Sequence, residues 1–135
     1  MIYELKIIDR PGGLQVTERY KTLTSGTFET AVLISTAVSA TLVTAETYNL
    51  LSNEPTQPMK KNLDFKSHYI PAIPNPQKGL IKDFMLGGKP WGDLPVIVCD
   101  CEIGYPNQII YGTDVLLMKC RKFSVNEESV IIETC

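Results

Sequence analysis

Apolar and polar residues alternate near the start of the chain, and this pattern predicts a β-hairpin over residues 2–23. Tyr3 and Leu5 alternate with charged neighbours, as expected of a strand that exposes one face to solvent. Residues 10–13 contain one proline and two glycines, which are the residue types that tight turns require. Residues 14–23 alternate again, so we expect them to pair antiparallel with the first strand.

The longest apolar stretch, residues 27–51, can be read as a helix or as strands. It has no Gly, Pro or Asp, and its only charged residues are Glu29 and Glu46. Capping residues precede it and a proline follows it, which favours a helix. Its even positions are mostly bulky and apolar, and it contains six threonines, which favours strands. Because a hairpin would need its turn near Ser39, where the turn chemistry is poor, the prediction is one long helix. A strand pair is the alternative.

A proline-rich segment follows, and it predicts an extended arm over residues 53–76. Seven of the nine prolines lie between residues 53 and 95, where they force extended backbone. The arm carries large apolar residues, so we expect it to lie against a surface of a neighbouring subunit or of its own domain. The residues expected to contact a partner are Phe65, Tyr69, Ile70, Ile73 and Trp91.

The remaining patterns complete a single-domain α+β prediction for residues 1–135. Residues 77–86 space their apolar side chains as a short amphipathic helix does, and residues 94–134 read as a β-rich region of strands and turns. The predicted fold is an antiparallel sheet of about five strands packed on one long helix at residues 27–51. The alternative, if that stretch forms strands, is an all-β sandwich or barrel.

Composition restricts the class of protein. The chain has 135 residues, of which 44% are hydrophobic and 21% charged, with a net charge of -2. This near-neutral balance makes a nucleic-acid partner unlikely on charge grounds. The first ten residues carry four charges, unlike a secretory signal, and the apolar residues 31–45 fall short of the roughly 20 that span a bilayer. We therefore expect a cytoplasmic protein, or part of a particle assembled in the cytoplasm, with no membrane partner.

Two groups of residues suggest a ligand site. Lys89 and Trp91 lie in a glycine-rich stretch, where a lysine can meet phosphate and a tryptophan can stack on a base. Asp100, Glu102 and Asp114 could form a carboxylate cluster of the kind that binds magnesium or works as an acid–base pair. Each group also has an ordinary structural reading, as a helix end with a core tryptophan and as the solvent face of a strand.

The cysteines and the single histidine predict no catalytic or metal site. Without a signal peptide, the four cysteines are expected to be free thiols that pack as small apolar residues. His68 lies in the arm, far in sequence from every cysteine. No catalytic residue, metal or cofactor is predicted. The cysteines are Cys99, Cys101, Cys120 and Cys135.

Two functions follow from these patterns. The main prediction is a non-enzymatic structural subunit of a symmetric homo-oligomer, of viral or phage type, whose arm contacts its neighbours. The alternative is a small-molecule or nucleotide-binding protein, and possibly a hydrolase. Its ligand site would lie near Lys89 and Trp91 and the carboxylates Asp100, Glu102 and Asp114.

Overall fold

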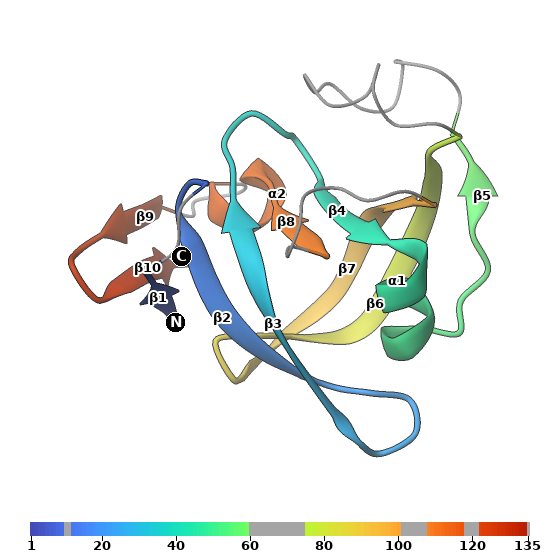
Figure 1. Ribbon diagram of the computed structural model, residues 1–135, viewed down its shortest axis with the longest axis horizontal. Coiled ribbons are helices and arrows are strands. Elements are labelled where there is room, and N and C mark those ends of the chain that lie inside the picture. Colours follow the sequence, from blue (N-terminus) through green and yellow to red (C-terminus); the bar gives the residue numbers. More distant parts are fainter. Residues whose placement is uncertain (10–11, 60–74, 101–107, 118–121, 135) are drawn as a thin grey trace.

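The computed structural model describes residues 1–9, 12–59, 75–100, 108–117 and 122–134. These residues form one mixed sheet of ten strands in the order β5-β6-β7-β4-β8-β3-β2-β1-β10-β9, together with two short helices (Figure 1). The strands are β1 (Ile2–Ile8), β2 (Gln15–Lys21), β3 (Thr27–Ile34), β4 (Thr41–Thr44), β5 (Gln57–Pro58), β6 (Gln77–Leu86), β7 (Lys89–Cys99), β8 (Ile109–Tyr111), β9 (Lys122–Val125) and β10 (Ser129–Glu133). The helices are α1 (Ala45–Leu51) and α2 (Thr113–Leu116).

The N-terminal hairpin is confirmed. Strand β1 pairs antiparallel with β2, and β2 pairs antiparallel with β3 along its whole length. On β2, Val16, Glu18 and Tyr20 are buried, whereas Arg19 and Lys21 are exposed. The period-two pattern therefore places one face of this strand in the core.

The long helix predicted for residues 27–51 is wrong. This stretch forms β3, a connection over residues 35–40, β4 and the seven-residue helix α1. The alternation of apolar and polar residues and the many threonines indicated strands correctly, because β-branched residues pack well against neighbouring strands of a sheet. The capping residues ahead of residue 27 form the β2–β3 turn instead, where the Thr22 amide donates to the Gly26 carbonyl at 3.1 Å. The helix N-cap is Thr44, whose side chain accepts a hydrogen bond from the Thr47 amide. The all-β alternative fits the structure, and the α+β prediction does not.

The centre of the sheet mixes parallel and antiparallel pairs, so the prediction of a purely antiparallel sheet is also wrong. Strand β8 runs parallel to β3 and antiparallel to β4, and β4 runs parallel to β7. Strands β4 and β8, which are distant from each other in sequence, thus lie side by side between β7 and β3. This arrangement places the β3–β4 connection at the ends of two central strands, β3 and β8.

The helix predicted for residues 77–86 is a strand, β6, which pairs with β7. A bulge lies between Ile81 and Phe84, where Asp83 has a φ of 53°. Because the bulge adds one residue to the strand, Ile81 and Phe84 both face the core although they are three positions apart. Buried residues three positions apart are typical of an amphipathic helix, which explains the wrong prediction. A tight turn follows at Gly87 and Gly88, both of which have positive φ.

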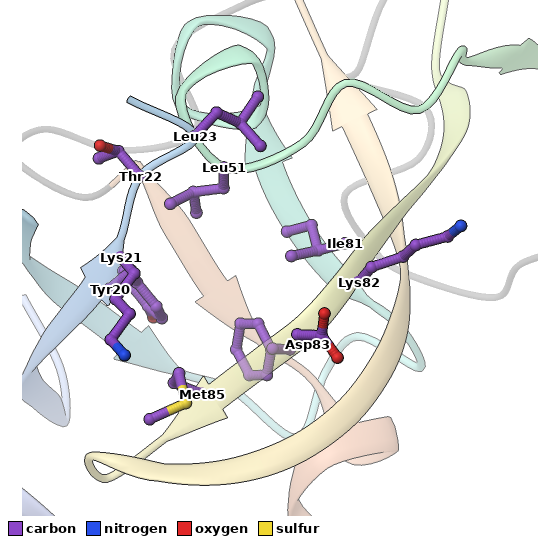
Figure 2. A pocket seen from close by; sticks show the side chains of 10 residues that line it. Tyr20, Lys21, Thr22, Leu23, Leu51, Ile81, Lys82, Asp83 and Met85 are labelled. Carbon is purple, nitrogen blue, oxygen red and sulfur yellow. The ribbon is translucent and has the colours of Figure 1, made fainter. Parts of the chain in front are cut away.

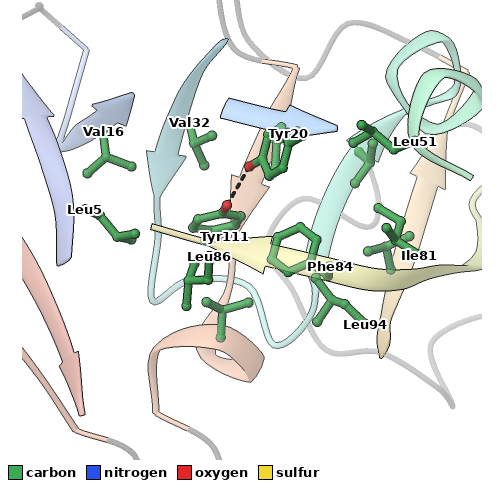
Figure 3. Packing of buried hydrophobic residues seen from close by; sticks show 14 of the residues in the cluster. Leu5, Val16, Tyr20, Val32, Leu51, Ile81, Phe84, Leu86, Leu94 and Tyr111 are labelled. Atoms are coloured by element: carbon green, nitrogen blue, oxygen red, sulfur yellow. Dashed lines mark hydrogen bonds between the residues drawn. The ribbon is translucent and has the colours of Figure 1, made fainter. Parts of the chain in front are cut away.

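The core lies where the curved sheet packs on itself. Its larger cluster contains residues from every strand except β5 and β9, and α1 and α2 also contribute buried side chains. Figure 3 shows Leu5, Val16 and Val32 on one side of Tyr111, and Leu51, Ile81 and Leu94 on the other. A smaller cluster, which includes Leu42, Ile97 and Ile110, lies on the opposite face of the central strands.

Candidate functional site

The β3–β4 loop, residues 35–40, is the irregular segment at the middle of the sheet. It begins where β3 ends beside β8, and it leads directly into β4 (Figure 1). Thr36, Ala37 and Ser39 are exposed, whereas Val38 is buried in the smaller cluster. The loop therefore presents small and hydroxyl-bearing residues to solvent while one side chain anchors it.

Backbone hydrogen bonds hold this loop against strand β8 and helix α2. The Ser35 amide donates to the Tyr111 carbonyl at 3.0 Å, and the Thr113 amide donates to the Val38 carbonyl at 2.9 Å. Within the loop, the Ala37 amide donates to the Ser35 hydroxyl at 3.1 Å. The loop shape thus comes from contacts with residues more than 70 positions further along the chain.

Asp114 fastens the end of the loop to α2. Its carboxylate accepts hydrogen bonds from the Thr41 amide at 2.9 Å and from the Thr41 hydroxyl at 3.0 Å. It also accepts from the amide of Val115 at 2.8 Å. Because three donors converge on this carboxylate, its visible role is to position backbone.

The loop has hydrogen-bonding groups but no acid or base. No Asp or Glu occurs between Glu29 and Glu46, so Ser35, Thr36 and Ser39 supply only hydroxyls. Hydroxyls and exposed backbone amides can bind the polar groups of an extended ligand. Any acid–base chemistry at this loop requires carboxylates from other parts of the chain or from a second chain.

A separate hollow lies at the other end of β2 and β3 (Figure 2). Its volume is about 250 Å³, and its lining includes the buried residues Tyr20, Leu51, Ile81 and Phe84. Lys21 lies at its rim, and Lys82 is bound to Glu54 at 2.9 Å. This hollow is smaller than the roughly 300–1,000 Å³ typical of small-molecule sites.

The structure does not bring the predicted ligand-site residues together. Lys89 and Trp91 lie at the start of β7, next to β1: the Lys89 ammonium donates to the Ile2 carbonyl at 2.9 Å, and Trp91 packs edge-on against Tyr3 at 5.2 Å. Asp100 follows the other end of β7. It lies about 30 Å from Trp91 when the distance is counted along the strand. Asp114 is bound to Thr41, and Glu102 lies outside the described residues.

Most of the predicted partner-contact residues, and most of the cysteines, lie outside the part of the chain that the structure describes. Phe65, Tyr69, Ile70 and Ile73 lie outside the described residues, as does His68. Cys99 is disulfide-bonded, which corrects the prediction of four free thiols. The other three cysteines lie outside the described residues. Among the described residues, no group of three or more metal-ligating side chains occurs.

Glu18 is a buried carboxyl outside the predicted sites. Its side chain lies on the core face of β2, and only 5% of the residue is exposed. Burial raises the pKa of Glu18 from 4.5 to about 7, although hydrogen bonds from Tyr111 and the Gly87 backbone act in the opposite direction. The alternating pattern could have revealed it, because Glu18 falls between Val16 and Tyr20 on the apolar face.

Comparison with known proteins identifies the fold. No family model and no curated protein matches the sequence. Among solved structures, the crystal structure of a retropepsin-like aspartic protease from Rickettsia conorii matches with a TM-score of 0.60 and 14% sequence identity. The match covers 98% of this chain and 91% of that chain. The chain therefore has a retropepsin-like fold.

This likeness overturns the main functional prediction. That prediction, a non-enzymatic structural subunit of viral or phage type, is corrected because the fold is one that a protein described as an aspartic protease has. No helix in the described part of the chain is long and apolar enough to cross a bilayer. The predicted cytoplasmic location and the homo-oligomeric state remain predictions.

Proposed function

We propose that this protein is a hydrolase that cleaves polypeptides. One observation carries the proposal: nearly the whole chain superimposes on a retropepsin-like aspartic protease, and the match covers most of that protein too. The hydroxyls and amides of the β3–β4 loop add support, since they suit the backbone of an extended peptide. The hydrolytic step rests on the likeness in fold alone.

Aspartic chemistry requires two carboxylates that share one proton. Of the described aspartates, only Asp114 is partly buried, and it binds Thr41. Asp9, Asp83, Asp93 and Asp100 are exposed, and Asp64 lies outside the described residues. In a dimer with a two-fold axis, the same residue meets its own copy. One aspartate per chain is then sufficient, and two copies build the site.

The test is a cleavage assay with an aspartate scan. The full chain is incubated with unfolded proteins and a peptide library between about pH 2 and 7, which covers the acidic range, up to about pH 5, in which paired carboxylates share one proton. Products are identified by mass spectrometry. Six variants each replace one aspartate by asparagine. We expect one variant that keeps the wild-type circular dichroism spectrum to lose at least about 100-fold in rate. The replaced residues are Asp9, Asp64, Asp83, Asp93, Asp100 and Asp114.

Glu29→Gln is the matched control, because Glu29 is exposed and pairs only at the surface with Arg19. It should cleave as wild type does. Equal cleavage by all six variants would reject the aspartic mechanism. If labelled unfolded peptides bind, as measured by fluorescence polarisation, and none is cleaved, the polypeptide ligand stands and hydrolysis is rejected.

A further inference from the structure

One edge of strand β2 has a gap in its backbone pairing. Successive residues of a strand direct their N–H and C=O groups to opposite edges. The Thr22 amide donates to the Gly26 carbonyl at 3.1 Å, so the even-numbered residues of β2 face β3 and the odd-numbered ones face the other edge. On that other edge, β1 pairs with β2 only as far as Thr17. Just beyond β2, the Leu23 amide donates to the Leu50 carbonyl of α1 at 3.0 Å.

Arg19 and Lys21 lie in the gap between these two attachments. Both residues are exposed, and no strand of the described chain lies opposite them on this edge. Unpaired backbone groups on a strand edge are a template for a further strand. The N–H and C=O groups of Lys21 are therefore available to a ligand that has a backbone of its own.

The hollow of about 250 Å³ lies along this gap. Side chains of successive strand residues point to opposite faces, yet residues 20–23 all line the hollow. A cavity lined by consecutive residues follows the edge of a strand rather than one of its faces. Residues 81–85 of β6 line the other side in the same way (Figure 2). The hollow therefore separates the edges of two strands.

The interior of the hollow is apolar. The rings of Tyr20 and Phe84 line it with their centroids 5.6 Å apart, and Leu51 and Ile81 add buried aliphatic groups. Leu23 on the rim is 52% exposed. An apolar group that enters the hollow would remove this surface from water, which stabilises the bound state.

The bulge in β6 keeps the two strands apart at this point. Near the β6–β7 turn, the Gly87 amide donates to the Glu18 carboxyl at 3.1 Å, so β6 lies close to β2 there. A bulge bends its strand, and beyond the bulge at Asp83 the backbone of β6 is bound to α1 through Leu80. Space for a ligand remains between Lys21 and the bulge.

We propose that this gap binds a short extended peptide of a partner protein, which pairs with the Lys21 backbone and inserts an apolar side chain into the hollow. Backbone pairing at a strand edge together with a side-chain pocket is the basis of recognition by strand addition. The hollow is smaller than the roughly 300–1,000 Å³ of small-molecule sites, and it has room for one large side chain. The site is independent of the proposed hydrolase activity, because it lies at the opposite end of β2 and β3 from the β3–β4 loop.

Lys21 determines the sequence pattern of the peptide. Residues directly opposite each other in an antiparallel pair place their side chains on the same face, so the peptide residue opposite Lys21 lies beside its ammonium group. The two neighbours of that residue point to the face of Tyr20, toward the hollow. Lys21 forms no ion pair with the described residues, whereas Lys82 on the other rim is bound to Glu54 at 2.9 Å. An acidic residue complements Lys21, and the expected pattern is apolar–acidic–apolar.

NMR on the full chain tests this site with two acetylated and amidated peptides, Thr-Leu-Glu-Leu-Thr and Thr-Phe-Glu-Phe-Thr. In the free protein, the Lys21 amide should exchange its hydrogen at least about tenfold faster than the Tyr20 amide, which is bonded to β3. Either peptide should slow exchange at Lys21 without changing it at Tyr20. The peptide should also shift the methyl resonances of Leu51 and Ile81.

Three changes to the leucine peptide separate the contributions. Alanine in place of both leucines should weaken binding at least about tenfold, because the hollow stays empty. Methylation of the glutamate amide nitrogen removes the donor to the Lys21 carbonyl and should weaken binding at least about threefold. With lysine in place of glutamate, binding to the wild type should fall by about two- to fivefold. Lys21→Glu should reverse this preference, which a loss of folding could not do.

Four results would overturn the proposal. A Lys21 amide as protected as Tyr20 in the free protein would show that the edge is already covered. Protection that appears only as the protein concentration rises would assign the edge to a second copy of the chain. Peptide-induced shifts confined to residues 35–40 would place the peptide at the β3–β4 loop instead. Finally, equal binding of the methylated and unmethylated peptides, or no shift at millimolar peptide, would exclude strand addition at Lys21.

Discussion

Gly112 lies at the point where the β8–α2 junction touches the β3–β4 loop. A Cβ atom on this residue would lie 2.7 Å from the Val38 carbonyl oxygen and 2.8 Å from that of Ala40. Both oxygens belong to backbone, so no side-chain rotation could relieve the contact. The position of the loop therefore depends on the absence of a side chain at Gly112.

Gly112→Ala is accordingly expected to lower the free energy of unfolding by about 1–3 kcal/mol through overpacking. Urea denaturation followed by Trp91 fluorescence measures this change. Gly26→Ala is the control, because the nearest atom to its added Cβ is the side-chain oxygen of Thr22 at 3.3 Å. This control should stay within about 1 kcal/mol of the wild type. A Gly112→Ala protein as stable as Gly26→Ala would show that the loop moves freely.

Side chains of helix α1 and its C-cap form hydrogen bonds with the backbone of strand β6, where β6 has no neighbouring strand. Its neighbour β5 has only two residues, which pair with Gln77 and Lys78, so the edge of β6 is uncovered beyond that point. The C-terminal part of α1 and its cap cover the next backbone groups. The Leu80 amide donates to the Tyr48 hydroxyl at 3.1 Å, and the Leu80 carbonyl accepts from the Ser52 hydroxyl at 2.6 Å. Helix α1 thus replaces the missing part of an edge strand.

Tyr48→Phe should lower the free energy of unfolding by about 1–3 kcal/mol, because it leaves the Leu80 amide without its acceptor. The Tyr48 hydroxyl also lies 2.9 Å from the Glu54 carbonyl, to which it can donate. Tyr3→Phe is the matched comparison, since it removes one hydrogen bond, to Pro90. Its expected cost is about 0.5–1.5 kcal/mol. Equal losses in the two variants, measured by urea denaturation, would contradict a role for Tyr48 at the β6 edge.

At the scale of the whole molecule, the parts that sequence could predict are those fixed by local periodicity. The hairpin of β1 and β2 followed from alternation and from the turn residues between the two strands. The β3–β4 loop could not be found, because it contains no proline or glycine and takes its shape from Tyr111 and Thr113. The bulge at Asp83 made a strand imitate a helix.

The pairing of distant segments was also hidden in the sequence. The parallel contacts of β3 with β8 and of β4 with β7 join residues more than 50 positions apart, and no local pattern encodes them. Lys89 and Asp100 were expected in one site because the strand was predicted to begin near residue 94, whereas β7 begins at Lys89 and separates the two residues by its whole length. Glu18 is different: its place on an apolar face was visible in the sequence.

The proposed hydrolase makes a final prediction about the whole molecule, because a site built from one aspartate per chain exists only in the dimer. We expect light scattering to give the mass of two chains at micromolar concentration. On dilution, the rate of peptide cleavage per chain should fall in parallel with the fraction of dimer. A second copy of the chain that carries the inactivating asparagine supplies a control, since mixing it in excess with wild type should reduce cleavage through mixed dimers. A monomer whose rate per chain is unchanged by dilution and by the inactive copy would place both carboxylates in one chain.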